Sequence, residues 1–363
     1  MNRKLIFVWI MCVVLVAVCS GAFADYVMMC TFFQNSEARA YKLTDDGEII
    51  PDYYLNVEAY DPIAIAFAPN GKWGLVGGTT GYPERYKTYV LGIDKERRIS
   101  LLGWVYNDRG WLVAISPDSR YGVHGADLRS LRFHPNGTFT DIPTTNPALA
   151  NHDAAFSKFN NYLYARSYPG IISEYQVLPD GRIGGTGFSI NIEPATGTGD
   201  VELTPDGRTC IALSMDPYNV TSMQVHKEGG LTLVQQFNVI NYNIEQIDFT
   251  PDSQYAVISF WDSREVGDLV SFRIGPDSRL TKVDSLDLPG SPGGNIAITP
   301  DGEYIIAIEL YYYYSLFYVA RLHEDGTMEY LPENDYICVG HVSDMAFVPP
   351  RITAAEGVWS MYE

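Results

Sequence analysis

Basic residues are scarce in this 363-residue sequence: 25 lysines and arginines stand against 44 aspartates and glutamates, for a formal net charge of −19. Such an excess of negative charge repels the phosphates of nucleic acids and the head groups of anionic membranes, so we expect neither as a partner. The excess has two further interpretations. It favours cationic ligands or metal ions, or it serves solubility alone.

Cysteines are also few, and the motifs of several enzyme classes are missing. The five cysteines lack the spacing of a metal site, and no Gly-rich phosphate loop or G-x-S-x-G nucleophile elbow occurs. A nucleotide-binding enzyme and a serine hydrolase are therefore not expected. Three cysteines follow residue 24, an odd number that cannot pair completely, and a bridge between Cys30 and Cys338 stays open.

Long apolar runs are absent except at the N-terminus. There Arg3 and Lys4 precede an apolar stretch from Leu5 to Val18, which ends in Ala22-Phe23-Ala24. This pattern predicts a signal peptide over residues 1–24, cleaved after Ala24, and a secreted or periplasmic protein with no membrane insertion after cleavage. The alternative is a membrane anchor, although the run is short for a span.

What the sequence has in abundance is one recurring turn. The stretch from Ile296 to Ile308 reads as an apolar strand, a Thr-Pro-Asp-Gly turn and a second apolar strand. Proline presets φ, aspartate bonds back to the backbone, and glycine accepts a positive φ. Equivalent positions recur roughly every 41 to 49 residues, a period typical of repeat architectures. They are Pro69, Pro117, Lys158, Pro205, Pro251, Pro300 and Pro349.

Each repeat predicts four strands. The residues two and four positions before the turn are apolar and the residue between them is mostly alanine, which is typical of a strand packed on both faces. A second turn farther along, such as Pro276-Asp277-Ser278, separates two more strands. Seven such units predict an all-β protein, a seven-bladed β-propeller with four-stranded antiparallel blades.

The two ends of the repeat array complement each other. Tyr26 to Thr31 lacks a first strand of its own, and Met345 to Val348 lacks a second. Pairing them in one closing blade removes an open sheet edge, so we expect the chain to close in this way. Residues 25–363 then form a single domain, with 349–363 as a C-terminal tail.

The repeat length and the Thr-Pro-Asp-Gly turn followed by an apolar triplet resemble the seven-bladed lactonase-like propellers. That group includes 6-phosphogluconolactonase, the fungal-type carboxymuconate cyclase and the YVTN surface-layer repeats. The resemblance spans nearly all of the mature chain and implies the fold. The lactonases carry an Arg-His pair before an innermost strand, which His152 matches without a preceding arginine. Glu245 matches a glutamate found before such a strand in some of these enzymes.

Aromatic residues gather in the longer loops, on the face opposite the tight turns. Loops on a rigid scaffold commonly bind ligands, and aromatic rings stack on sugars, peptides or partner side chains. We therefore expect a protein, carbohydrate or small-molecule ligand on this loop face, unless these side chains only cover the blades. The candidates are Tyr82, Tyr168, Tyr218, Trp261 and Tyr311.

The starts of the innermost strands converge on the central channel. Ligand contacts are expected there from Trp111, Asp153, Asp200, Asn295 and His341. Carboxylate oxygens suit a hard cation, so Asp153, Asp200 and Asp344 are candidate Ca²⁺ ligands, although no cofactor is required. Crowded carboxylates raise one another's pKa and can supply a general acid or base. The catalytic candidates are His152, Glu245 and Arg109. A merely solvated polar lining is the alternative.

Two hypotheses follow. The first is an exported, non-catalytic scaffold that binds a partner through its loop face and channel. The second is a lactonase-like hydrolase or cycloisomerase that works in the channel through His152 and Glu245. The incomplete Arg-His pair and the signal peptide favour the first, because sugar-phosphate lactonases act on cytosolic metabolites. A channel with few cations also suits a phosphorylated substrate badly.

Overall fold

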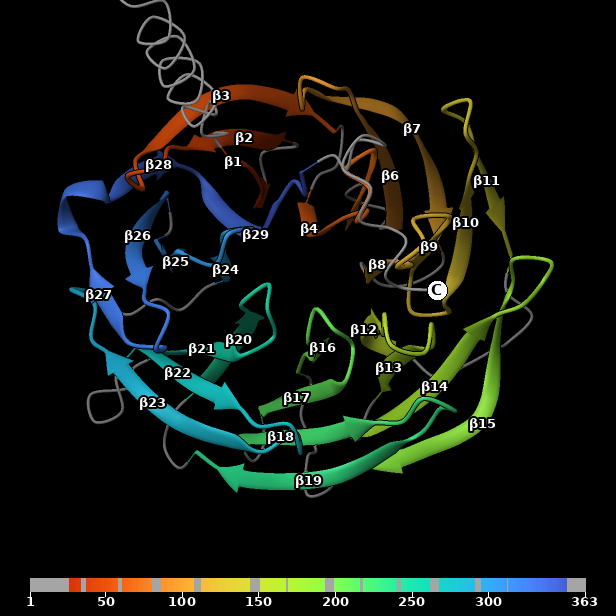
Figure 1. Cartoon of the computed structure of the whole chain (residues 1–363). Coiled ribbons are helices and arrows are strands. Elements are labelled where there is room, and N and C mark those ends of the chain that lie inside the picture. The colour runs from red at the N-terminus through yellow and green to blue at the C-terminus, as the bar shows by residue number, and fades with distance from the viewer. Residues whose placement is uncertain are drawn as a thin grey trace, which may run out of the picture.

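The chain forms seven antiparallel sheets set radially around one axis (Figure 1). The all-β, seven-bladed β-propeller expected from the repeat is therefore confirmed. The predicted signal peptide and the tail beyond residue 350 lie outside the part of the chain that this computed structural model describes. The described residues are 26–33, 37–57, 61–79, 86–107, 112–143, 151–167, 169–192, 199–215, 218–239, 243–261, 268–290, 295–311 and 313–350.

Each blade is a meander whose strands run in order from the axis outward. Blade 1 contains β4 (Asp61–Phe67), β5 (Trp73–Thr79), β6 (Tyr86–Ile93) and β7 (Ile99–Asn107). Blade 2 contains β8 (Val113–Ile115), β9 (Tyr121–His124), β10 (Arg129–Phe133) and β11 (Phe139–Ile142). Blade 3 contains β12 (Asn151–Phe156), β13 (Leu163–Ser167), β14 (Ile171–Val177) and β15 (Ile183–Asn191).

The remaining blades repeat this order. Blade 4 contains β16 (Val201–Leu203), β17 (Thr209–Met215), β18 (Tyr218–Val225) and β19 (Leu231–Asn238). Blade 5 contains β20 (Asn243–Phe249), β21 (Tyr255–Trp261), β22 (Leu269–Ile274) and β23 (Leu280–Leu286). Blade 6 contains β24 (Ile296–Ile298), β25 (Tyr304–Leu310), β26 (Tyr314–Leu322), β27 (Met328–Tyr330) and β28 (Tyr336–Val339). Blade 7 contains β29 (His341–Phe347), β1 (Tyr26–Phe33), β2 (Glu37–Leu43) and β3 (Ile49–Asn56).

The closing blade joins the two ends of the chain. Its innermost strand, β29, pairs antiparallel with β1, and Cys30 lies opposite Met345. The backbone N–H of Val348 extends the ladder by donating to Val27 O at 2.8 Å. The predicted closure by N- and C-terminal strands is therefore confirmed, and it removes the open edge at which another chain could add.

The recurring turn has the geometry that its residues predict. In blade 6 the amide of Gly302 donates to Thr299 O at 2.8 Å, and Gly302 adopts φ +83°. The Thr299 hydroxyl donates to Asp301 and accepts from the amide of Tyr304 at 3.0 Å. In blade 5 Ser253 takes the glycine position at φ +62°, and its hydroxyl accepts the Asp206 amide of blade 4. A positive φ is less favourable for serine than for glycine, and the hydrogen bond that Ser253 forms between the two blades offsets part of this cost.

Blade 6 departs from the regular pattern at its outer strand. β27 pairs with one end of β26 and β28 pairs with the other, so two short segments share the outermost position. Between them lies a 3-10 turn over Pro332–Asn334. Proline has no backbone N–H to donate to a ladder, so the strand is interrupted there.

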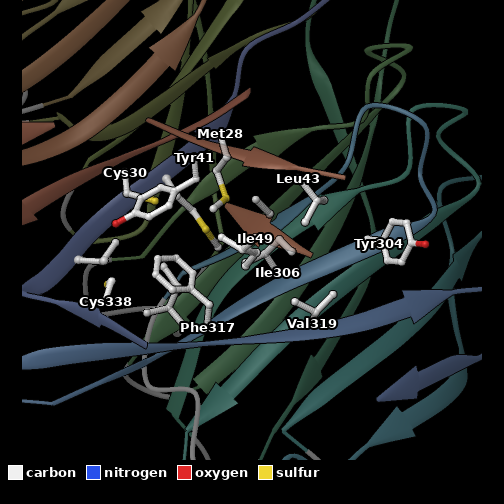
Figure 2. Close-up of a cluster of buried hydrophobic side chains, with 14 of the residues drawn as sticks. Met28, Cys30, Tyr41, Leu43, Ile49, Tyr304, Ile306, Phe317, Val319 and Cys338 are labelled. Carbon is white, nitrogen blue, oxygen red and sulfur yellow. The ribbon is translucent and has the colours of Figure 1, made fainter. Parts of the chain in front are cut away.

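The hydrophobic core lies between blades rather than at the axis. Each of the seven apolar clusters is shared by two adjacent blades. Figure 2 shows the cluster between blades 6 and 7, with Cys30, Tyr41, Phe317 and Cys338 among its side chains. Cys30, Cys338 and Cys210 are all free and buried, so the bridge left open by the sequence does not form. Cys338 belongs to β28 in blade 6, whereas Cys30 lies in the closing blade.

Polar side chains also tie neighbouring blades together near the tight turns. Glu174 of blade 3 is 3% exposed and accepts hydrogen bonds from the Tyr164 hydroxyl at 3.0 Å and the Thr186 hydroxyl at 2.8 Å. It also accepts the backbone N–H of Gly230, in a turn of blade 4. A buried carboxylate with this many donors is stabilised, whereas its donors would be left unpaired without it.

We therefore expect Glu174→Ala to lower the free energy of unfolding by about 2–4 kcal/mol, since it strands buried donors and opens a cavity. Urea unfolding followed by circular dichroism measures this. The matched control is Glu228→Ala, an exposed glutamate in the same turn as Gly230, which should change stability by less than about 0.5 kcal/mol. Equal effects of the two substitutions would show that Glu174 does not link the blades.

Candidate functional site

A cavity of about 690 Å³ lies on the propeller axis. Every blade contributes its innermost strand to the wall, and Figure 1 shows these strands ringing the axis. The strands are β4, β8, β12, β16, β20, β24 and β29. We call this cavity the central channel. Its volume falls in the range of small-molecule sites, which is about 300–1,000 Å³.

Two positions in each blade, in the innermost strand or just before it, border the channel. Five residues before the recurring turn the chain has Ala64, Leu112, Asp153, Asp200, Gln246, Asn295 and Asp344. Three residues before the turn it has Ala66, Ala114, Ala155, Glu202, Asp248, Ala297 and Ala346. The channel therefore receives acidic side chains from blades 3, 4, 5 and 7, and hydrocarbon from blades 1 and 2.

Three of these carboxylates take part in holding the ring together. Asp344 accepts the backbone N–H of Ile65 in blade 1 at 2.8 Å. Asp153 accepts that of Val201 in blade 4 at 2.7 Å, and Asp248 accepts that of Ile298 in blade 6 at 2.6 Å. Each bond joins one blade to the next, so these side chains have a structural task.

Two amide side chains also form hydrogen bonds between neighbouring blades. Gln246 accepts the N–H of Ile296 at 2.8 Å, and Asn295 donates to Ser343 O at 3.0 Å and to Asp344 at 2.7 Å. Asn295, predicted as a ligand contact, therefore links blades 6 and 7. Its amide is already engaged with two acceptors of the closing blade.

Asp200, Glu202 and Glu245 differ from the carboxylates that bond to a following blade. Their side chains line the channel, and within the part of the chain that is described none of these three side chains forms a hydrogen bond or ion pair. They are half-buried, because their exposed surface faces the channel. Carboxylates without a partner in an enclosed space are available to a ligand.

Burial and, for Asp200 and Glu202, repulsion between negative charges raise the pKa of these acids. Burial is the largest cause of a raised pKa at both Asp200 and Glu202, and the negative charge of Asp153 adds to it. Burial also raises the pKa of Glu245, brings the pKa of Asp248 to about 6 and brings that of Asp344 to about 7. Asp248 and Asp344 thus titrate near neutrality, where general acids and bases work.

A buried arginine partly offsets this charge. Arg166 of β13 is 1% exposed and donates to Leu213 O and to the Ser214 hydroxyl, the latter at 3.1 Å. Gly199 passes so close that a Cβ there would lie 2.4 Å from the guanidinium, so glycine is required. The positive charge of Arg166 opposes the rise in pKa at Asp153 and Asp200.

The channel brings together five of the sequence-predicted residues, namely Asp153, Asp200, Glu245, Asn295 and Asp344. Three others lie outside its lining: Tyr218 begins β18, Tyr311 follows β25, and His341 begins β29. His152 lies in β12 and Trp261 ends β21, but their side chains are outside the described part of the structure. Tyr82, Arg109, Trp111 and Tyr168 are outside it altogether.

Sequence reasoning missed Glu202, Asp248, Gln246 and Arg166. For the two acids a signal was present, because they replace alanine at a position where the other five blades keep it. Gln246 and Arg166 carried no such signal. Their importance comes from neighbours 47 to 50 residues away along the chain.

The predicted calcium ligands do not form a metal centre. Among the described residues no group of three or more His, Cys, Asp or Glu side chains is placed to hold an ion. Asp153 and Asp344 each already accept a backbone N–H of the following blade, which leaves fewer oxygens for a cation. Calcium therefore has no support from this arrangement.

The loop face is described best at blade 6. The rings of Tyr311 and Tyr314 stack with centroids 4.4 Å apart, and Tyr313 is 77% exposed. Glu309 accepts the Tyr318 hydroxyl, and its hydrogen bond with Tyr311 raises the pKa of that phenol to about 12. Exposed tyrosine faces can stack on planar or sugar groups.

Similarity to known proteins is confined to three-dimensional structure. No protein-family profile and no curated protein matches this sequence. A 6-phosphogluconolactonase candidate from Bacteroides uniformis superposes with TM-score 0.73 and 17% identity, over 89% of this chain and 99% of that chain. A periplasmic gluconolactonase from Pseudomonas aeruginosa gives TM-score 0.75 and 15% identity, with coverages of 89% and 99%. A hypothetical selenium-binding protein from Sulfolobus tokodaii gives 0.66 and 9%, with coverages of 89% and 93%.

These similarities bear out the expected fold. The chain has the seven-bladed, 6-phosphogluconolactonase-like architecture, with a central channel of its own composition. At such low identities the likeness concerns fold alone, since one fold hosts many activities. No helix within the described residues is long and apolar enough to cross a membrane.

The charge in the channel predicts a stability gain from Glu202→Gln that depends on pH. A raised pKa means that the folded protein resists an ionisation that the unfolded chain allows. The contribution of Glu202 to the free energy of unfolding is thus fully present below the ordinary glutamate pKa of 4.5 and is lost as pH rises above that value. We expect a higher melting temperature at pH 8, by about 2–4 °C for each kcal/mol of relieved repulsion, and none at pH 4.

Differential scanning calorimetry at the two pH values measures this effect. The control is Glu228→Gln, the same substitution at an exposed turn, which should leave the pH dependence of the melting temperature unchanged. A Glu202→Gln variant that is no more stable at pH 8 than the unaltered protein would show that the channel acids do not repel one another.

Proposed function

We propose that this protein is an exported binding scaffold whose principal site is the central channel. One observation carries the proposal: the side chains of Asp200, Glu202 and Glu245 line the channel without partners among the described residues. By contrast, Asp153 and Asp344, at the position of Asp200, and Asp248, at the position of Glu202, bond to the following blade. Fold stability does not require unpaired buried carboxylates and is reduced by them. Their presence is therefore best explained by a ligand.

The loop face is a further part of this proposal. Tyr218, Tyr311 and the exposed Tyr313 offer ring faces to a protein, carbohydrate or small-molecule partner. The signal-like N-terminus supports export to the periplasm or beyond. The structural similarity to a protein described as a periplasmic gluconolactonase agrees with this location.

Hydrolysis of a lactone is the second candidate. It is favoured by channel carboxyls with pKa values raised toward neutrality and by structural neighbours described as lactonases. A carboxylate such as Glu245 would take a proton from water while the water oxygen adds to the lactone carbonyl. The ring C–O bond would then break and the proton would pass to the ring oxygen. His152 and Arg109 are the predicted companions of Glu245.

A pH-stat assay of the purified protein against phosphorylated and unphosphorylated lactones, with and without calcium, separates the two functions. For a binding scaffold we expect no acid release above the spontaneous rate, because no arginine precedes His152 in the sequence to complete the Arg-His pair of the resembling lactonases. Turnover that falls at least about tenfold in both His152→Ala and Glu245→Gln would overturn the scaffold proposal. Turnover retained in both variants would place the chemistry outside the channel.

A further inference from the structure

The channel wall has two chemically different parts, here called its halves, and on one side of the ring Asn295 of blade 6 and Asp344 of blade 7 lie between them. At the bordering positions, blades 1 and 2 contribute Ala64, Ala66, Leu112 and Ala114, which carry no polar side-chain atoms. Blades 3 to 5 contribute an acidic half at the equivalent positions, together with Glu245. Its members are Asp153, Asp200, Glu202, Glu245 and Asp248. A ligand that fills the cavity must therefore meet hydrocarbon on one side and carboxylates on the other.

The acidic half holds more carboxyl groups than the positive charge among the described residues around it could balance if all of them ionised. Asp153 and Asp248 each accept a backbone N–H, but an N–H carries no full positive charge. Arg166 lies outside the channel lining, but its positive charge acts on Asp153 and Asp200, and its guanidinium is also bonded to Leu213 O and the Ser214 hydroxyl. One arginine against five carboxyl groups leaves this half in need of a further cation.

We propose that the channel binds a small amphipathic organic cation, that is, an ammonium or guanidinium group on a compact apolar body. The cationic group lies against Asp200 and Glu202, which offer unengaged oxygens, and the body lies against the hydrocarbon of blades 1 and 2. This inference rests on the channel being the binding site and names the class of its ligand.

Other ligand classes fit the two halves less well. An anion, including a sugar phosphate, would enter a space already lined by like charges, at a cost of several kcal/mol when desolvated. A neutral polyol would hydrogen-bond to the acids but leave the hydrocarbon half without apolar contact. An inorganic cation would also leave the hydrocarbon half without apolar contact, and no metal-binding group occurs among the described residues.

Proton linkage gives the proposal an independent signature. Burial and neighbouring charge raise the pKa of Asp200 and Glu202, and an approaching cation would lower it again. Affinity should therefore increase as pH rises, with release of protons to the buffer. The charged groups facing this pair are Asp153, Arg166, Glu245, Asp248 and Asp344.

Three probes of one shape and different charge test the inference: benzylamine, benzyl alcohol and benzoate. Isothermal titration calorimetry with the purified protein at pH 7.5 should show benzylamine binding at least about tenfold more tightly than benzyl alcohol, and benzoate not binding. Titrations in two buffers of different ionisation enthalpy should show that benzylamine releases protons. Equal affinity for benzylamine and benzyl alcohol would overturn the cationic class while leaving the channel as a binding site.

Substitutions locate the bound cation. Glu202→Gln and Asp200→Asn keep the shape of each side chain and should each weaken benzylamine at least about fivefold, while benzyl alcohol is unaffected. Glu228→Gln, at an exposed turn, should change neither. Benzylamine affinity that survives both channel substitutions would place the probe elsewhere and contradict the channel as the site. Failure of benzylamine to bind at 10 mM would overturn the proposed ligand class.

Discussion

The hydrogen bond from an innermost strand to the backbone of the following blade is the interaction on which this structure depends. Asp344, Gln246, Asp153 and Asp248 each direct an oxygen to an N–H of the next blade, and the bonded residues lie about 48 to 280 positions away in the chain. These bonds satisfy backbone N–H groups on the innermost strands of blades 1, 4 and 6. They also fix the spacing of blades whose apolar faces would otherwise pack without a preferred register.

These hydrogen bonds between blades also affect the chemistry of the channel. Bonds of this kind require polar side chains at the axis, where water is limited and carboxyl groups are costly to ionise. Asp153, Asp248 and Asp344 offset part of that cost through the N–H groups they accept. Asp200 and Glu202 have no such compensation, although they occupy the same two positions in blade 4. The asymmetry between blades, rather than the fold itself, is what distinguishes a site from a structural ring.

The likeness to proteins described as lactonases should be weighed with this distinction in mind. The superposition extends over most of the chain, but it reports the arrangement of strands and not the side chains at the axis. An acidic channel with one hydrocarbon side differs from what a sugar phosphate would require. A fold built of repeated blades allows such change, because each innermost strand can vary while the apolar clusters between blades are kept.

The sequence by itself determined the blade. The Thr-Pro-Asp-Gly turn and the apolar alternation around it are local, so the repeat, the seven blades and the closure of β29 on β1 could all be predicted from them. Because these signals are local, they do not predict contacts between distant parts of the chain. The break in blade 6 follows from Pro332, yet the placement of Cys338 on that blade depends on how β28 replaces an outer strand.

Only the tertiary structure decided the channel. Whether an acid such as Asp153 bonds to the next blade, or remains unengaged as Asp200 does, depends on a backbone N–H that lies 48 residues farther along the chain. Glu202 and Asp248 were visible as exceptions to alanine, and the convergence of the innermost strands was expected, but which acids would bond to a neighbouring blade was not. No single repeat encodes this, because the distance between groups on different blades is set by the packing of all seven.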